Sequence, residues 1–193
     1  MRKIAPHKNI FRYSVSLHAS HGCYIGRMAL PSHPFWEYSL ALYAKSGVSG
    51  DCLMLQDEYG LDVNLILFCI WAGAEGPGEL TEVELSECVA RAGQWQTEVV
   101  VPIRRIRRAL KQDALGATSE LVHIYRPRVQ GLELESEHVE QLLLATLVPQ
   151  SRGGTGKVVA LKNTQRYLQQ VGLDSDGGAK TAVERIIAQA FPG

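Results

Sequence analysis

The sequence predicts an all-α protein, a compact bundle of about six to eight helices around one buried central helix. The first observation is the segment from Leu65 to Ala74, LILFCIWAGA, which contains no charged residue. A helix that is apolar on every side has no face to offer to water, so it belongs at the centre of a bundle. The second observation is that β-branched and aromatic residues seldom alternate with polar ones, as half-buried strands require. Helix start and stop signals recur along the chain instead.

Two helices are expected ahead of the central one. The first spans residues 34–45, with a proline in its first turn, where the missing N–H costs nothing, and Gly47 behind it. The second spans residues 49–59 and ends at a glycine. Asp62 then precedes the apolar run, so its carboxylate can cap the central helix by accepting N–H groups of the first turn. Polar residues close the run at both ends, and it is too short for a membrane span, which takes about 20 apolar residues.

The clearest start signal in the chain is a capping box formed by Thr81 and Glu84, with Leu80 and Leu85 as its hydrophobic staple. This helix is expected to continue until Pro102 kinks it or begins a new one, because proline removes an internal hydrogen bond.

Further helical stretches are expected after Pro102. The sequence patterns place them at residues 102–111, at a short helix within 115–131 that ends in a turn at Arg126-Pro127, from Ser136 to Leu147, at 157–171 and at 179–190.

The 193 residues are expected to form one all-α domain, residues 28–193, behind a basic leader, residues 1–27. The leader holds five basic and no acidic residues, which leaves 15 basic and 20 acidic residues, a charge of about −5, for the rest. The leader lacks the apolar core of a secretory signal. We expect it to be disordered or to lie upstream of the true start, because the helical pattern begins only after Met28.

Cysteine usage indicates a reducing, cytoplasmic setting. The four cysteines form no CxxC pair, and three of them stand among apolar neighbours, where a free thiol packs as a small hydrophobic group. His18, His21 and Cys23 have a superficial metal-ligand spacing but no second half of a site. No metal and no cofactor is expected.

The first candidate site is a polar pocket at the start of the central helix. Its members are Glu37, Gln56, Asp57, Asp62 and Asn64. Oxygen-rich side chains of this kind can hold a hard cation, or serve as an acid and base pair if burial separates their pKa values. The interpretation we favour is structural: Asp62 caps the helix, Asn64 is bonded locally and Asp57 pairs with an arginine.

The second candidate site is a basic set on the helix after Pro102. The set comprises Arg104, Arg105, Arg107, Arg108 and Lys111. At 100° per residue most of these side chains fall within one arc of about 100°, with Ile103, Ile106 and Leu110 opposite. We expect the apolar side to face the core. The basic side would then dock a phosphate-bearing or acidic partner, or pair with Asp57 or Asp62. The structural alternative is a solvated face with ion pairs to neighbouring helices.

Two other features are given a structural interpretation. The stretch from Ser151 to Val158 resembles a phosphate-binding loop, but it lacks the required glycine at 151 and the Ser or Thr at 158, and no strand leads into it. Trp36, Trp71 and Trp95 have apolar neighbours and are expected to be packing residues. No local arrangement of Ser, His, Asp or Cys supports nucleophilic catalysis.

The segments FWEYSLALYAKSGVSGDCLMLQDEYGLDVNLILFCIW and WQTEVVVPIRRIRRALK carry a family resemblance. Their most specific elements are Phe35-Trp36, Leu55-Gln56-Asp57, Asp62-Val63-Asn64, Trp71, Trp95 and the basic helix from Pro102 to Lys111. Together they resemble an uncharacterised bacterial family, the domain of unknown function numbered twenty-three ninety, from about Met28 to the C-terminus. The resemblance implies a bacterial cytoplasmic protein and supplies no activity and no catalytic residue.

The function we predict from the sequence is non-catalytic interaction, in which the basic helix docks an acidic or phosphate-bearing partner. The sequence allows self-association, nucleic acid is disfavoured by the acidic body, and no membrane is expected. The alternative is an enzyme, or a protein that binds a small ligand or metal, with an oxygen-rich pocket built by Glu37, Asp57, Asp62 and Asn64.

Overall fold

The structure, a computed structural model, describes residues 30–112, 116, 118–148 and 154–192. These residues form only helices and connections, so the all-α prediction is confirmed. The helices are α1 (Pro34–Tyr43), α2 (Val48–Tyr59), α3 (Val63–Ala74), α4 (Glu82–Trp95), the π turn η2 (Gln96–Val100), α5 (Val101–Gln112), α6 (Ser119–Leu147), α7 (Lys157–Gln170) and α8 (Gly177–Ala190). The leader lies outside the described residues, as do His18, His21 and Cys23. None of the described helices is long and apolar enough to cross a membrane.

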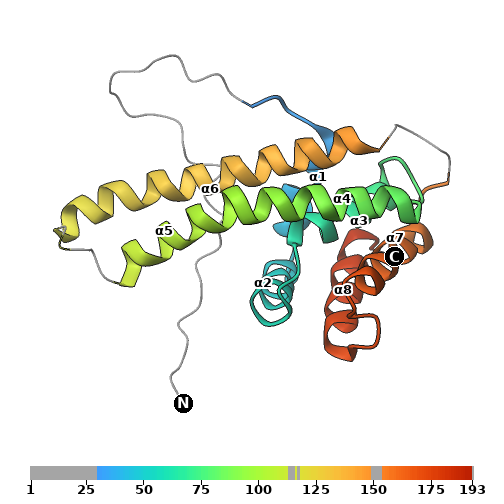
Figure 1. The fold of residues 1–193 in the computed structure, drawn as a ribbon. Helices are drawn as coiled ribbons and strands as arrows, with labels where there is room; N and C mark the ends of the chain where they lie inside the picture. The colour runs from blue at the N-terminus through green and yellow to red at the C-terminus, as the bar shows by residue number, and fades with distance from the viewer. Residues whose placement is uncertain (1–29, 113–115, 117, 149–153, 193) are drawn as a thin grey trace.

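Helix α3 is the buried centre of the bundle, as its sequence predicts. Every residue from Asn64 to Gly73 is buried. The helix begins where Asp62 Oδ1 accepts a hydrogen bond from the Asn64 N–H at 2.9 Å, so the predicted cap is confirmed. Helices α1, α2, α4, α6, α7 and α8 all pack against α3 (Figure 1).

The closest helix packing joins α3 to α7. A Cβ added at Gly73 would overlap the backbone of Ala160, so only glycine permits this approach. Asn163 of α7 fastens the loop that follows α3: its Oδ1 accepts from the Leu80 N–H at 2.9 Å, and its Nδ2 donates to Gly78 O at 3.0 Å. The α3–α7 contact therefore depends on one small residue and one buried amide.

The start signals around the central helix are confirmed with small shifts in their bounds. Gly60 ends α2 with a φ of 67°, in the left-handed region that favours glycine. Thr81 and Glu84 form the predicted capping box. Cys52, Cys69 and Cys88 are free and buried, as expected.

Pro102 neither breaks nor restarts the helix that begins at Glu82. The helix passes from α4 into α5 through the π turn η2, and Pro102 is the second residue of α5. A π turn widens the ring of backbone hydrogen bonds by one residue, which accommodates a proline that cannot donate.

The largest difference from the sequence prediction is α6. We expected a turn at Arg126-Pro127 and a new helix capped by Ser136, but one helix of 29 residues runs from Ser119 to Leu147 with Pro127 inside it. Thr118 caps this helix by accepting from the Leu121 N–H. Ser136 is buried within the helix, where its hydroxyl donates to Glu133 O. Packing of the second half of α6 against α1, α3 and α4 outweighs the single hydrogen bond that Pro127 removes.

The α5–α6 hairpin extends beyond the rest of the bundle. Here the hairpin means residues 101–132, comprising α5 and the first half of α6. The two helices run side by side on the left of Figure 1, away from α7 and α8. Its base is fixed to the bundle by polar side chains described below.

Candidate functional site

The predicted polar pocket and the predicted basic set meet at one small cavity beside the start of α3. The cavity has a volume of about 40 Å³, and its polar lining comes from Gln56, Asp62, Asn64, Gln96, Arg104 and Glu137. Three of the five predicted pocket residues line it, together with one residue of the basic set. A cavity of this size is large enough for a few water molecules or a cation of a few atoms, and it is far smaller than the usual sites for metabolites or cofactors.

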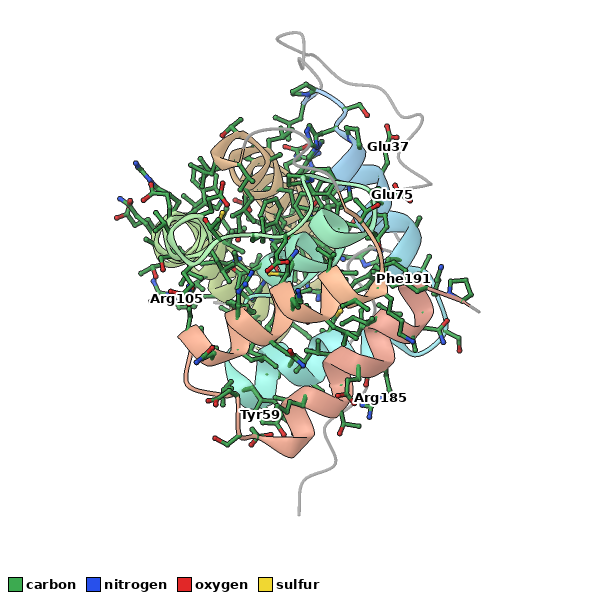
Figure 2. The ribbon with its side chains drawn as sticks, turned by 90° about the vertical axis from the view of Figure 1, so that its right-hand side faces the viewer. Glu37, Tyr59, Glu75, Arg105, Arg185 and Phe191 are labelled. Carbon is green, nitrogen blue, oxygen red and sulfur yellow. The ribbon has the colours of Figure 1, made fainter. Side chains whose placement is uncertain are left out.

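The other two predicted pocket residues lie elsewhere. Glu37 is exposed and accepts a hydrogen bond from the Ser32 hydroxyl at 2.5 Å. Figure 2 shows Glu37 and Arg105 at separate edges of the molecule. Asp57 accepts from Arg108 at 3.4 Å, so the predicted pairing of Asp57 with an arginine is confirmed. Neither carboxylate contributes to the cavity lining.

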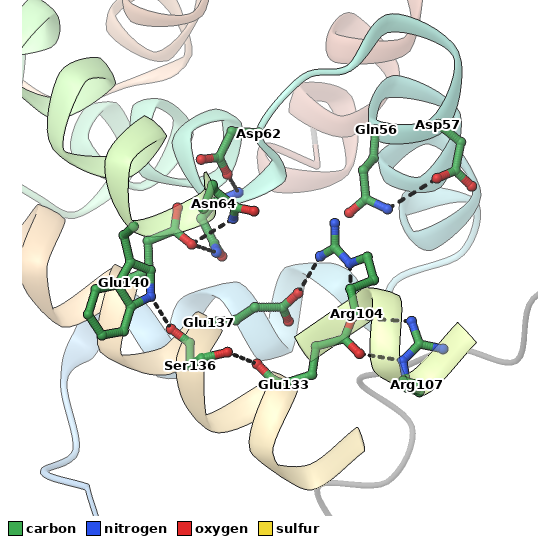
Figure 3. A network of polar contacts seen from close by, with 12 residues as sticks. Gln56, Asp57, Asp62, Asn64, Arg104, Arg107, Glu133, Ser136, Glu137 and Glu140 are labelled. Atoms are coloured by element: carbon green, nitrogen blue, oxygen red, sulfur yellow. Dashed lines mark hydrogen bonds and ion pairs between the residues drawn. The ribbon is translucent and has the colours of Figure 1, made fainter. Parts of the chain in front are cut away.

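Two arginines of the basic set point into the protein, contrary to our expectation. Arg104 donates to Glu133 and to Glu137, each at 2.9 Å, and Arg107 pairs with the same Glu133 (Figure 3). Glu133 has no exposed surface. Its carboxylate must therefore be paired, and α6 presents it to the basic side of α5.

The remaining members of the basic set are exposed, and the predicted apolar face is not fully covered. Arg105 and Lys111 face solvent, and Arg108 is half exposed beside Asp57. Ile106 is 50% exposed, although the pattern placed it toward the core. Only Arg104 and Arg107 of the basic set thus face α6, and the other three members lie outside that contact.

A second pair of carboxyl groups lies next to these ion pairs. Glu140 is fully buried, and its Oε2 accepts from Asn64 Nδ2 at 3.0 Å and from Gln96 Nε2 at 2.7 Å. Its Oε1 and Asp62 Oδ2 are both buried and have no hydrogen-bond partner, and the nearby Asp62 carboxyl group raises the pKa of Glu140. Two carboxyl groups buried close together disfavour double ionisation, so a raised pKa of Glu140 relieves the repulsion between them.

Burial changes the acidity of this layer. Burial raises the pKa of both Asp62 and Glu140. The negative charges of Asp62 and Glu137 raise the pKa of Glu140 further. Burial also raises the pKa of Glu137 to about 7, although the Arg104 guanidinium acts in the opposite direction. This part of the protein contains four carboxyl groups, those of Asp62, Glu133, Glu137 and Glu140, but only two guanidinium groups, those of Arg104 and Arg107. Protonation of Glu140, and in part of Glu137, brings the layer close to neutrality. We call Asp62, Arg104, Arg107, Glu133, Glu137 and Glu140 the buried polar layer.

The tryptophans are packing residues, as predicted. Trp71 stacks on Phe35 at 5.1 Å between ring centroids, and Trp36 stacks on His138 at 4.1 Å. Trp95 Nε1 donates to Ser136 O at 2.9 Å. In the glycine-rich stretch, Ser151 lies outside the described residues, and Gly156 N–H donates to Gly73 O at the end of α3.

The sequence profile of a family described as "Protein of unknown function (DUF2390)" matches residues 34–144. The chain belongs to this family. The match begins at α1 and includes every member of the buried polar layer, so the DUF2390 region contains the whole candidate site. It stops before α7 and α8, whereas we expected the likeness to reach the C-terminus. No curated protein and no solved structure matches the chain.

Sequence reasoning missed the acidic half of this DUF2390 site. Glu133, Glu137 and Glu140 recur at helical spacings of four and three and are all buried on one side of α6. Because the sequence pattern divides α6 at Pro127 and Ser136, that spacing was not recognised as one face. In the described ranges, no three His, Cys, Asp or Glu side chains are grouped as metal ligands.

Proposed function

We propose that the protein is an interaction module that docks a partner through the α5–α6 hairpin. The proposal keeps the function predicted from the sequence but changes the residues. Arg104 and Arg107 pair with Glu133 and Glu137. The basic contribution therefore comes from Arg105 and Lys111, with a smaller part from Arg108, which is half exposed and pairs with Asp57.

One observation carries this proposal, namely the exposed apolar side chains of the hairpin. Nine large hydrophobic side chains are exposed in the described part of the chain, and six of them lie on this hairpin. They are Val101, Ile106, Leu121, Ile124, Tyr125 and Leu132. Single exposed hydrophobic residues need no explanation, but several on one projecting element are typical of an interaction site.

The buried polar layer supports the proposal by explaining how such a surface is held. Ion pairs between α5 and α6 join the two helices at the base of the hairpin. Breaking one partner of a buried pair is costly, so the base is rigid while the outer face stays available. Preorganisation of this kind lowers the entropic cost of binding.

The test is quantitative capture from a bacterial lysate with three forms of the full chain. One is wild type, one carries Leu121→Gln and Leu132→Gln on the hairpin, and the control carries Val83→Gln and Val158→Gln on α4 and α7. Circular dichroism and thermal unfolding verify that each form is folded. We expect at least one macromolecule to be retained by wild type and control and reduced at least tenfold with the hairpin variant. Identical captures with all three forms would remove the proposal.

A second candidate function is binding of a small ligand at the cavity. It is favoured by the oxygen atoms that Asp62, Asn64 and Glu137 bring to the cavity lining, among which Asp62 Oδ2 is buried without a hydrogen-bond partner. A donor-rich cation of few atoms, such as ammonium or methylammonium, suits these oxygens and the cavity volume. Thermal unfolding of the wild type and of Asp62→Asn, with and without each cation, tests this candidate. A cation that binds here should raise the unfolding temperature of the wild type and leave that of Asp62→Asn unchanged.

A further inference from the structure

We infer that the partner of the hairpin is an acidic amphipathic helix, which lies along α6 and extends the hairpin by one helix. This inference rests on the proposed function and names the chemistry of the partner. It is carried by the spacing of the exposed apolar side chains and by the charge around them.

The spacing matches a helical partner. Leu121, Tyr125 and Leu132 are four and seven residues apart, so they lie along one side of α6. At 1.5 Å per residue they form a stripe about 17 Å long, which corresponds to about three turns of a partner helix. An amphipathic helix supplies anchors at the same spacing on its own apolar side.

The backbone of the hairpin excludes recognition by an added β-strand, the other common way in which proteins bind peptides. An added strand needs unpaired N–H and C=O groups along an exposed edge. In α5 and α6 these groups are paired within each helix, apart from the carbonyl opposite Pro127 and those at the ends. Contact must therefore be made through side chains.

Charge determines which amphipathic helix fits. Among the described residues of the hairpin, the exposed basic side chains are Arg105, Arg108, Lys111 and Arg128, against one exposed acidic side chain, Glu120. Arg108 already pairs with Asp57 of α2, so the charge offered to a partner comes mainly from Arg105, Lys111 and Arg128. Arg128 lies within the apolar stripe, between Tyr125 and Leu132. Carboxylates beside the partner's leucines would pair with these cations and would set the register and orientation.

The same charges disfavour a second copy of this chain as the occupant. Counting described residues alone, two hairpins packed on each other would bring together Arg105, Lys111 and Arg128 of both copies, six basic side chains, against two acidic ones. Nucleic acid would pair with the cations but would leave the leucine and isoleucine side chains without apolar contact. An acidic helix satisfies both sets of side chains.

The experiment uses a display library of helical peptides 18 residues long as its probe. Each peptide has leucines fixed on one stripe, and the flanking positions are drawn at random from Glu, Lys and Gln. Selection on the full wild-type chain is compared with selection on Leu121→Gln/Leu132→Gln and on Arg105→Gln/Lys111→Gln. The Val83→Gln/Val158→Gln form serves as the matched control.

We expect Glu to be enriched at the flanking positions on wild type and on the control. A selected peptide should then bind the Leu121→Gln/Leu132→Gln form at least tenfold more weakly, and the Arg105→Gln/Lys111→Gln form several-fold more weakly, with a difference that shrinks at high salt. Enrichment of Lys, or equal selection on all four forms, overturns the inference.

Two companion measurements separate this inference from the proposed function. Sedimentation of the free chain would overturn the inference if it showed a dimer that the Leu121→Gln/Leu132→Gln form loses. Co-sedimentation with vesicles of anionic lipid would overturn it on the same criterion. If lysate capture depends on the hairpin but no acidic peptide is selected, the proposed docking function is supported and the inference that the partner is an acidic helix is wrong.

Discussion

At the scale of single residues, the buried polar layer is where charge and burial are most finely balanced. Glu133 accepts from both Arg104 and Arg107, while Glu140 accepts from neutral amides and lies near Asp62. The layer therefore divides into a charged half beside α5 and a protonated half beside α3. Substitutions in the two halves are therefore expected to affect stability in different ways.

Glu137→Gln is expected to flatten the pH dependence of stability. Burial raises the pKa of Glu137 to about 7 from its ordinary 4.5, against the pull of Arg104 and with the push of Glu133. A raised carboxyl pKa stabilises the fold fully below the unfolded value, and this contribution is lost as the pH rises through 7. Wild type should lose up to about 3 kcal/mol more than the variant between pH 4.5 and 8. Urea unfolding at both pH values measures the difference, and parallel losses would contradict the prediction.

Glu140→Gln is expected to be nearly neutral and Glu140→Met costly. At pH 7 the glutamine amide mimics a protonated carboxyl group, because it can accept from Asn64 and Gln96 and donate to Asp62. Its effect on the free energy of unfolding should stay within about 1 kcal/mol, whereas methionine leaves two buried donors unpaired and costs about 2 to 4 kcal/mol. Denaturant unfolding at pH 7 compares the two. A large loss in the glutamine variant would mean that Glu140 is ionised there.

At the scale of elements, close approach and helix continuity decide the arrangement. Gly73→Ala is expected to destabilise the protein by about 1 to 3 kcal/mol, because its Cβ would overlap the Ala160 backbone where α3 meets α7. Gly93→Ala is the control: Gly93 lies in α4 with no atom near its added Cβ, and this change should stabilise by about 0.5 to 1 kcal/mol. Thermal unfolding of both variants measures the contrast. Equal effects would show that the α3–α7 approach is looser than the structure indicates.

At the scale of the whole molecule, burial is unevenly distributed between bundle and hairpin. Helix α3 is contacted by six other helices, while α5 packs mainly on α6 and on the adjoining π turn η2. Opening free energies follow buried contacts, so different parts of one fold open at different rates. The hairpin is the part with the least burial.

Hydrogen exchange should therefore show two levels of amide protection, high in the bundle and low in the hairpin. Amides of α3 are expected to exchange only with global unfolding, and amides of residues 119–130 much faster, because the outer half of α6 is exposed and contains Pro127. Mass spectrometry of peptides from exchanged protein measures both. If a partner binds the hairpin, protection should rise there and stay unchanged in α3. Uniform protection in the free protein would contradict this prediction.

The all-α class, the buried central helix, the Asp62 cap and the Thr81 capping box could all be predicted from the sequence. These features depend on residues within a few positions of one another, where helix geometry fixes which side chains meet. The pairing of Asp57 with an arginine was also foreseen, as a general need of a carboxylate near a basic helix. Gln56, Asp62 and Asn64 were recognised as a group for the same local reason.

Only the tertiary structure decided where the basic set points and what completes the cavity. Arg104 pairs with Glu133 and Glu137, which are 29 and 33 positions away, and the sequence pattern places a helix break between α5 and these partners. Local propensity at Pro127 favours a break, but packing along α6 outweighs it and brings the acidic side of α6 against α5. The amphipathic pattern of α5 assumed that charges face water. Buried carboxylates on a neighbouring helix reversed that assumption, because an unpaired buried charge costs more than an exposed isoleucine.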